Sequence, residues 1–119
     1  MSEGRVDLVP FVVGLVVVYL VFWFFRRSRQ VTAKAAHLMV DTGAVLLDVR
    51  TAKEFAAGHL PGAVNVPLPM LTENPAAVGP RERPVVVYCQ SGTRSALASV
   101  VLRRAGFSQV ADLGSMARW

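Results

Sequence analysis

The stretch Pro84-Val-Val-Val-Tyr-Cys-Gln-Ser-Gly-Thr-Arg94 changes from an apolar run to a polar loop within a few residues. The β-branched and aromatic side chains of residues 84–88 predict a buried strand. Residues 89–94 follow as a loop, and a helix is expected from about Ser95 to Ala105, where Gly106 ends it. A strand that turns through a short loop into a helix is typical of α/β proteins.

The neighbouring segments repeat this alternation. Apolar, β-rich runs at residues 44–49, 63–66 and 108–113 predict further strands. Helical spacing after Thr32 and the capping box Thr51-x-x-Glu54 predict helices between them. The sequence therefore predicts an α/β fold with a small parallel β-sheet and helices on both of its faces.

In a parallel sheet of this kind the functional site lies at the carboxyl ends of the strands. Asp48-Val49-Arg50 follows one expected strand, and the loop that begins at Cys89 follows another. Amides that curl toward a helix N-terminus, together with the Arg94 guanidinium, favour a thiolate at Cys89. The candidate loop residues are Gln90, Ser91, Gly92, Thr93 and Arg94. The alternative is that Cys89 is only a small buried hydrophobic residue at a strand end.

The N-terminal part of the chain has a different composition. Residues 8–25 contain no charged side chain and would span about 27 Å as a helix, close to the hydrocarbon thickness of a bilayer. They predict one transmembrane helix, since the acidic residues before them and the lack of a cleavage site disfavour a signal peptide. Arg26, Arg27 and Arg29 follow, so the positive-inside rule places the N-terminus outside and the rest in the cytoplasm. We therefore expect a single-pass cell-membrane protein, in contact with membrane lipid, with an anchor and basic linker at 1–30 and a domain at 31–119.

Composition excludes several other classes of protein. The 119 residues hold 13 Lys and Arg against 8 Asp and Glu, a modest and dispersed surplus of +5 that does not favour nucleic-acid binding. One cysteine excludes an intramolecular disulfide and a cysteine-cluster metal site. The two histidines, His37 and His59, have no carboxylate at metal-ligand spacing, so no metal site is expected.

A set of short motifs carries a resemblance to a known family. In chain order they are Leu47–Arg50, Glu54-Phe55, Gly58–Ala63, Asn65–Pro67, Val86–Cys89, Gly92, Arg94–Ala96, Leu102, Ala105–Phe107, Gly114 and Trp119. From about Val31 to the end, the sequence resembles a single-domain rhodanese-like sulfurtransferase. Ser115 stands where that family usually has a glycine.

The resemblance implies that Cys89 accepts a sulfane sulfur and holds it as a persulfide. The donor would be thiosulfate or a persulfide, and cyanide, a small thiol or a protein thiol would accept the sulfur. No metal or organic cofactor is implied. The amides of residues 90–94 would surround the persulfide, with Arg94 bracing the loop. Asp48, Arg50, Glu54 and His59 would be supporting residues, and Arg50 and Glu54 would form an ion pair.

Two other functions are considered. A loop that wraps phosphate needs five residues between cysteine and arginine, whereas this loop has four, so sulfur transfer is favoured over a cysteine-dependent phosphatase. The second alternative is a non-catalytic, membrane-tethered binding module that keeps the rhodanese-like fold.

Overall fold

Four parallel strands form the sheet at the centre of the domain. The computed structural model describes residues 6–119, except for the side chains of residues 26–28. The strands are β1 (Val45–Asp48), β2 (Val64–Asn65), β3 (Val85–Cys89) and β4 (Val110–Ser115), in the order β2-β1-β3-β4. Every neighbouring pair is parallel, so the expected parallel α/β sheet is confirmed. β3 lies between two neighbours and ends at the cysteine.

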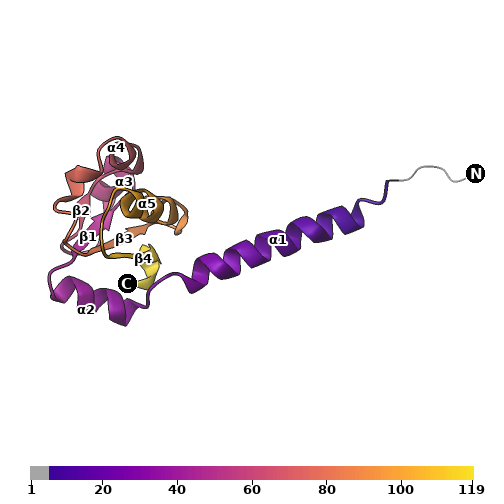
Figure 1. The fold of residues 1–119 in the computed structure, drawn as a ribbon, viewed down its shortest axis with the longest axis horizontal. Helices are drawn as coiled ribbons and strands as arrows, with labels where there is room; N and C mark the ends of the chain where they lie inside the picture. The colour runs from indigo at the N-terminus through magenta and orange to yellow at the C-terminus, as the bar shows by residue number, and fades with distance from the viewer. Residues whose placement is uncertain (1–5) are drawn as a thin grey trace, which may run out of the picture.

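The strands bury side chains on both faces, as their uninterrupted apolar sequences predict. On one face Leu47, Val87 and Leu102 belong to a core that α4 (Leu68–Glu73) and α5 (Thr93–Arg104) cover. On the other face Leu46 and Tyr88 pack in a second core, beneath α2 (Ala33–Asp41) and the C-terminal 3-10 helix η2 (Met116–Arg118). Helices thus cover both faces of the sheet, as expected (Figure 1).

Local signals explain where the short helices begin. The Thr32 side chain accepts a hydrogen bond from the amide of Ala35 at the start of α2. The capping box expected from Thr51 and Glu54 is present at the start of α3 (Ala52–Ala57). A 3-10 helix, η1 (Pro75–Val78), follows α4 and leads toward β3. α3 thus connects β1 to β2, and α4 with η1 connects β2 to β3.

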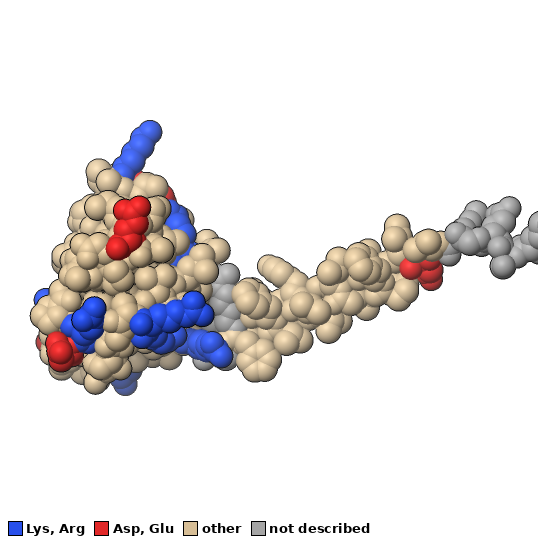
Figure 2. All heavy atoms as spheres, turned by 45° about the horizontal axis from the view of Figure 1, so that its top comes forward, with Lys and Arg blue, Asp and Glu red and all other residues tan. Residues whose placement is uncertain are grey.

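The first helix, α1 (Val9–Ser28), projects away from the domain (Figure 1). Its large apolar side chains between Val9 and Phe25 are all at least 44% exposed. Residues 9–25 contain no charged residue, and this stretch of the helix is tan in Figure 2. Among the residues that the structure describes, no helix is long and apolar enough to cross a membrane. The transmembrane span expected at 8–25 is therefore not supported.

α1 joins the domain next to its C-terminal segment. Gln30 pairs with Asp112 of β4 through a parallel bridge, and the Val31 amide donates to the Asp112 carbonyl over 2.9 Å. Arg118 in η2 donates hydrogen bonds to the Gln30 side chain at 2.6 Å and the Val31 carbonyl at 3.1 Å. The base of α1 is thus attached to the same edge of the domain as β4 and η2.

Candidate functional site

The nucleophile candidate lies where β3 turns into α5. Cys89 is the last residue of β3 and its side chain is buried. Its Sγ accepts a hydrogen bond from the Gly92 amide over 2.9 Å. Gly92 is the N-cap of α5 and has φ 99° and ψ −6°, a left-handed conformation that side chains other than glycine rarely adopt. The glycine therefore allows the loop to turn so that a backbone N–H reaches the sulfur.

Residues from both neighbouring strands hold the loop at Gln90. On one side, Arg50 donates from Nη1 to the Gln90 Oε1 over 3.2 Å. On the other side, the Ser115 hydroxyl at the end of β4 donates to the Gln90 carbonyl over 2.7 Å. The central position of β3 makes this possible, because groups after β1 and at the end of β4 flank the loop.

The buried ion pair beneath the loop joins Arg50 to Asp48. The Arg50 guanidinium donates to both carboxylate oxygens of Asp48, with Nη2 at 2.8 Å, and also to the Gly58 carbonyl at 2.6 Å. Asp48 hydrogen bonding raises the pKa of Arg50. The expected pairing of Arg50 with Glu54 is wrong. The Arg50 guanidinium forms its ion pair with Asp48, two residues earlier in the chain.

Glu54 pairs instead with Arg94, forty residues further along the chain. Arg94 donates to Oε1 at 2.6 Å and to Oε2 at 3.0 Å, a two-pronged contact between half-buried side chains. The hydrogen bonds from Arg94 lower the pKa of Glu54 to about 2. Arg94 therefore joins the start of α5 to α3, and a carboxylate compensates its positive charge.

His59 contacts the end of α3 rather than the cysteine loop. Its ring stacks on Phe55 with centroids 3.7 Å apart, and Nδ1 lies 2.8 Å from the Phe55 carbonyl. This agrees with a supporting role in the turn that follows α3. Nearby, the Tyr88 hydroxyl accepts a hydrogen bond from the Leu60 amide, and burial raises the pKa of Tyr88 to about 12.

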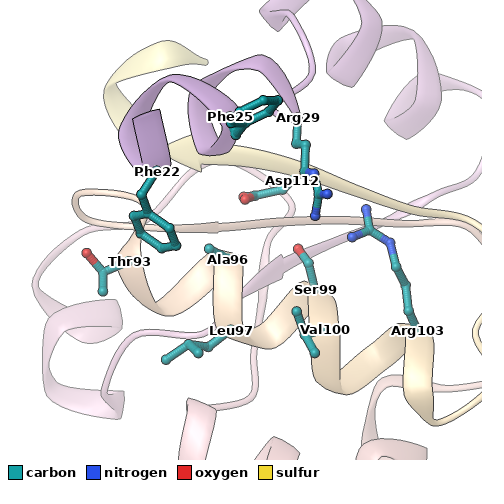
Figure 3. A pocket seen from close by; sticks show the side chains of 10 residues that line it. All are labelled: Phe22, Phe25, Arg29, Thr93, Ala96, Leu97, Ser99, Val100, Arg103 and Asp112. Carbon is teal, nitrogen blue, oxygen red and sulfur yellow. The ribbon is translucent and has the colours of Figure 1, made fainter. Parts of the chain in front are cut away.

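Two hollows lie on either side of Thr93. One has a volume of about 420 Å³, and its lining includes Ser91 and Thr93 from the loop, Ser115 and Arg118 from the C-terminal segment, and Tyr19 and Trp23 from α1. The other has a volume of about 520 Å³ and lies between α1 and α5. Figure 3 shows that the Phe22 ring of α1 points toward Thr93 and Ala96 in this second hollow. The first hollow borders the loop at Ser91 and Thr93.

Ser115 and Arg118 were not among the candidate site residues. The sequence places them more than twenty residues after Cys89, in a segment without a charge or cysteine pattern of its own. Only the position of β4 beside β3 brings them to the loop. The departure from glycine at Ser115 was visible in the sequence, and the structure shows that its hydroxyl binds the loop carbonyl.

Comparisons with known proteins match the domain that follows α1. The model of the rhodanese-like domain family matches residues 32–119. The uncharacterised protein YqhL of Bacillus subtilis is 38% identical over 77 residues, which are 64% of this chain and 60% of YqhL. The chloroplastic thiosulfate sulfurtransferase 16 of Arabidopsis thaliana is 36% identical over 110 residues, with 79% of this chain and 88% of the plant protein covered.

A solved structure agrees with these sequence matches. The human single-domain sulfurtransferase TSTD1 superposes with a TM-score of 0.66 at 29% identity, and the match covers 76% of this chain and 94% of the human protein. Both kinds of comparison lead to the same family.

Proposed function

The chain belongs to the rhodanese-like sulfurtransferases, and we propose that Cys89 accepts a sulfane sulfur and passes it on as a persulfide. The observation that carries this proposal is the 2.9 Å hydrogen bond from the Gly92 amide to Sγ, at the point where β3 meets α5. A donor directed at the sulfur stabilises its anionic, nucleophilic form. Thiosulfate is the first donor to test, since a relative that is 36% identical is named for it.

The reaction consists of two balanced displacements at sulfur. The Cys89 thiolate attacks the outer sulfur of thiosulfate, a new S–S bond forms, and the old S–S bond breaks with its electron pair leaving on sulfite. In the second step cyanide, or the thiolate of a small or protein thiol, attacks the outer sulfur of the persulfide. The bond between Sγ and that sulfur breaks, and the electron pair returns to Sγ. Each step leaves the charge balanced without a cofactor.

The loop residues have distinct roles in this proposal. The amides of residues 90–94 face the negative charge of the persulfide, because they lie at the N-terminus of α5. Arg94 and Glu54 hold the loop against α3, while Arg50 and Asp48 hold it from below. These are positioning residues, since their charges are already paired with each other.

Intact mass spectrometry of the full chain in detergent tests the proposal. After exposure to thiosulfate, the protein should gain the mass of one sulfur atom, and cyanide should remove that mass and release thiocyanate. Cys89→Ser should abolish the gain. Met70→Leu changes another sulfur-containing side chain, which is exposed on α4, and should load normally. A wild-type chain that gains no sulfur from thiosulfate or from an organic persulfide would refute sulfur carriage.

One observation favours a second candidate function, a binding module without catalysis. The Cys89 side chain is 0% exposed, and the positive charge of Arg94 is compensated by Glu54. A fold that buries its thiol can still recruit a partner through its surface. If Cys89→Ala leaves the cellular phenotype intact while an unfolding substitution abolishes it, the binding module is the better description.

We also propose that α1 attaches the protein to the lipid of the cell membrane, with the domain on the cytoplasmic side. The support is the exposure of the apolar side chains of α1 from Val9 to Val18, outside the two hollows, because apolar surface of this size is normally covered by lipid or protein. Arginines at 26, 27 and 29 come directly after the apolar stretch, and they favour a cytoplasmic position for the domain at 31–119.

Fractionation and thiol labelling test this attachment. Leu15→Arg places a charge on α1 and should move the protein from the membrane pellet to the supernatant, whereas Leu38→Arg on exposed α2 should not. An impermeant thiol reagent should label Cys89 after lysis but not in intact cells. Recovery of the wild type in the supernatant, or labelling in intact cells, contradicts the proposal.

A further inference from the structure

The three arginines around the loop differ in how their charges are compensated. Arg50 pairs with Asp48 and Arg94 pairs with Glu54. Arg118 donates its hydrogen bonds to neutral oxygens, those of the Gln30 side chain at 2.6 Å, the Leu113 carbonyl at 2.7 Å and the Val31 carbonyl at 3.1 Å. Within the described part of the chain, no carboxylate forms an ion pair with it. Its positive charge is therefore available to an anion.

Arg118 also lies in the hollow next to the loop. The 420 Å³ hollow is bounded by Ser91 and Thr93 on the loop side and by Arg118 on the C-terminal side. Three hydrogen bonds use three of the five N–H groups of a guanidinium, so donors remain for a ligand. The loop contributes hydroxyl groups at the same place. An anion in this hollow would meet one fixed charge and two polar side chains.

One side of the hollow is aromatic and comes from α1. Tyr19 and Trp23 are four residues apart, so they lie on the same face of the helix. Beyond Thr93, the hollow between α1 and α5 adds the apolar side chains of Phe22 and Leu97 (Figure 3). A ligand held by Arg118 would therefore have apolar surface within reach on the α1 side.

We propose that this hollow is the donor-binding site, in which Arg118 binds the anionic end and Trp23 contacts an apolar group. The preferred donor is then an organic sulfane-sulfur anion, such as an aryl or alkyl thiosulfonate or persulfide, rather than inorganic thiosulfate. The proposal rests on the proposed function of Cys89. With a thiosulfonate, the thiolate attacks the outer sulfur, the S–S bond to the sulfonyl group breaks, and a sulfinate leaves with the electron pair.

The charge of Arg118 can be tested without sulfur transfer. Cys89 is alkylated in the full chain, in detergent, with anionic iodoacetate and with neutral iodoacetamide, and the ratio of the two rates is compared between variants. Loss of a hydrogen bond to a charged group predicts that Arg118→Gln lowers this ratio about ten-fold. Arg118→Lys keeps the charge and should restore most of it. Arg103→Gln removes a cation from the other hollow and should leave the ratio unchanged.

The apolar wall is tested with two unreactive anions. Benzenesulfonate and methanesulfonate carry the same charge, and each should protect Cys89 from iodoacetamide at a measurable concentration. In the wild type, benzenesulfonate should protect at a lower concentration. Removal of the aromatic contact predicts that Trp23→Ala reduces this preference about ten-fold. Phe11→Ala, a substitution of an exposed aromatic residue nearer the start of α1, is the matched control and should change nothing.

The two measurements separate this inference from the function of Cys89. An iodoacetate preference that survives in Arg118→Gln, or is lost equally in Arg118→Lys, overturns the charge assignment. An unchanged benzenesulfonate preference in Trp23→Ala overturns the apolar wall. Sulfur loading is followed in the same samples by mass, so a protein that loads sulfur but fails these tests refutes only the donor site.

Discussion

Gly92 offers the sharpest test of the loop, because a second glycine provides a matched control. Gly92 and Gly106 lie at opposite ends of α5 with nearly the same φ, 99° and 97°. Alanine in the left-handed region costs about 1–2 kcal/mol at either position. A Cβ at Gly106 would meet only the flexible Arg81 side chain, with Cδ at 3.3 Å. We expect each substitution to lower the free energy of unfolding by at least this backbone cost; Gly106 is exposed, whereas Gly92 is buried.

The two variants should differ in sulfur loading. Only Gly92 donates to the Cys89 Sγ, so strain that shifts its amide weakens the contact on which the proposed nucleophile depends. For a domain of this size the stability loss corresponds to a fall in Tm of about 4–8 °C per kcal/mol, which leaves both variants largely folded at 25 °C. We therefore expect Gly106→Ala to load sulfur normally and Gly92→Ala to load slowly.

Urea unfolding and the time course of sulfur loading, followed by intact mass, measure the two quantities on the same samples. The reasoning is refuted if Gly92→Ala loads sulfur as fast as Gly106→Ala at an equal folded fraction.

Three further substitutions probe the support of the site. Asp48→Asn leaves the Arg50 guanidinium, which is 4% exposed, without a charged partner, and should cost about 3–5 kcal/mol in urea unfolding; an unchanged midpoint contradicts the buried pair. Glu54 has its pKa lowered from 4.5 to about 2, so its pairing stabilises the fold above pH 4.5 and is lost as the pH falls toward 2. The stability difference between wild type and Glu54→Gln should therefore shrink over that range, and a difference that persists at pH 2 contradicts it. Leu102→Ala removes a fully buried side chain and should lower the free energy of unfolding by about 2–5 kcal/mol, measured by urea unfolding. Because Cys89 is unchanged, the folded variant should still gain the mass of one sulfur atom. A stability cost below about 1 kcal/mol would contradict the place of Leu102 in the core.

Local patterns predicted most of the fold. The apolar run before Cys89 forms β3, as predicted, and α3 begins at the predicted capping box of Thr51. Signals of this kind act over about four to six residues, which is the scale on which a sequence can be interpreted directly. Some observed boundaries differ from the predicted ones by a few residues. Helix α5, for example, begins at Thr93 rather than near Ser95.

The pairing of charges around the site could not be predicted in this way. The resemblance implied an ion pair between Arg50 and Glu54, but side chains four residues apart lie close together only within a helix. Arg50 precedes the N-cap of α3, so its side chain turns back to Asp48 instead. Glu54 meets Arg94 only because β1 and β3 are adjacent in the sheet. In a similar way, Arg118 lies near the loop because it follows β4, which is adjacent to β3 in the sheet.

Strand β3 is hydrogen-bonded along both of its edges, and Cys89 is the last residue to share in that ladder, opposite Ser115. The next residues, Gln90 to Gly92, lie outside it. The amides of Gln90 and Ser91 should therefore exchange faster than those of β3, whereas the Gly92 amide, which donates to the Cys89 Sγ, should stay protected. Sulfur would thus be received at a boundary between backbone that the sheet fixes and backbone that side chains hold, at Gln90 through Arg50 and Ser115.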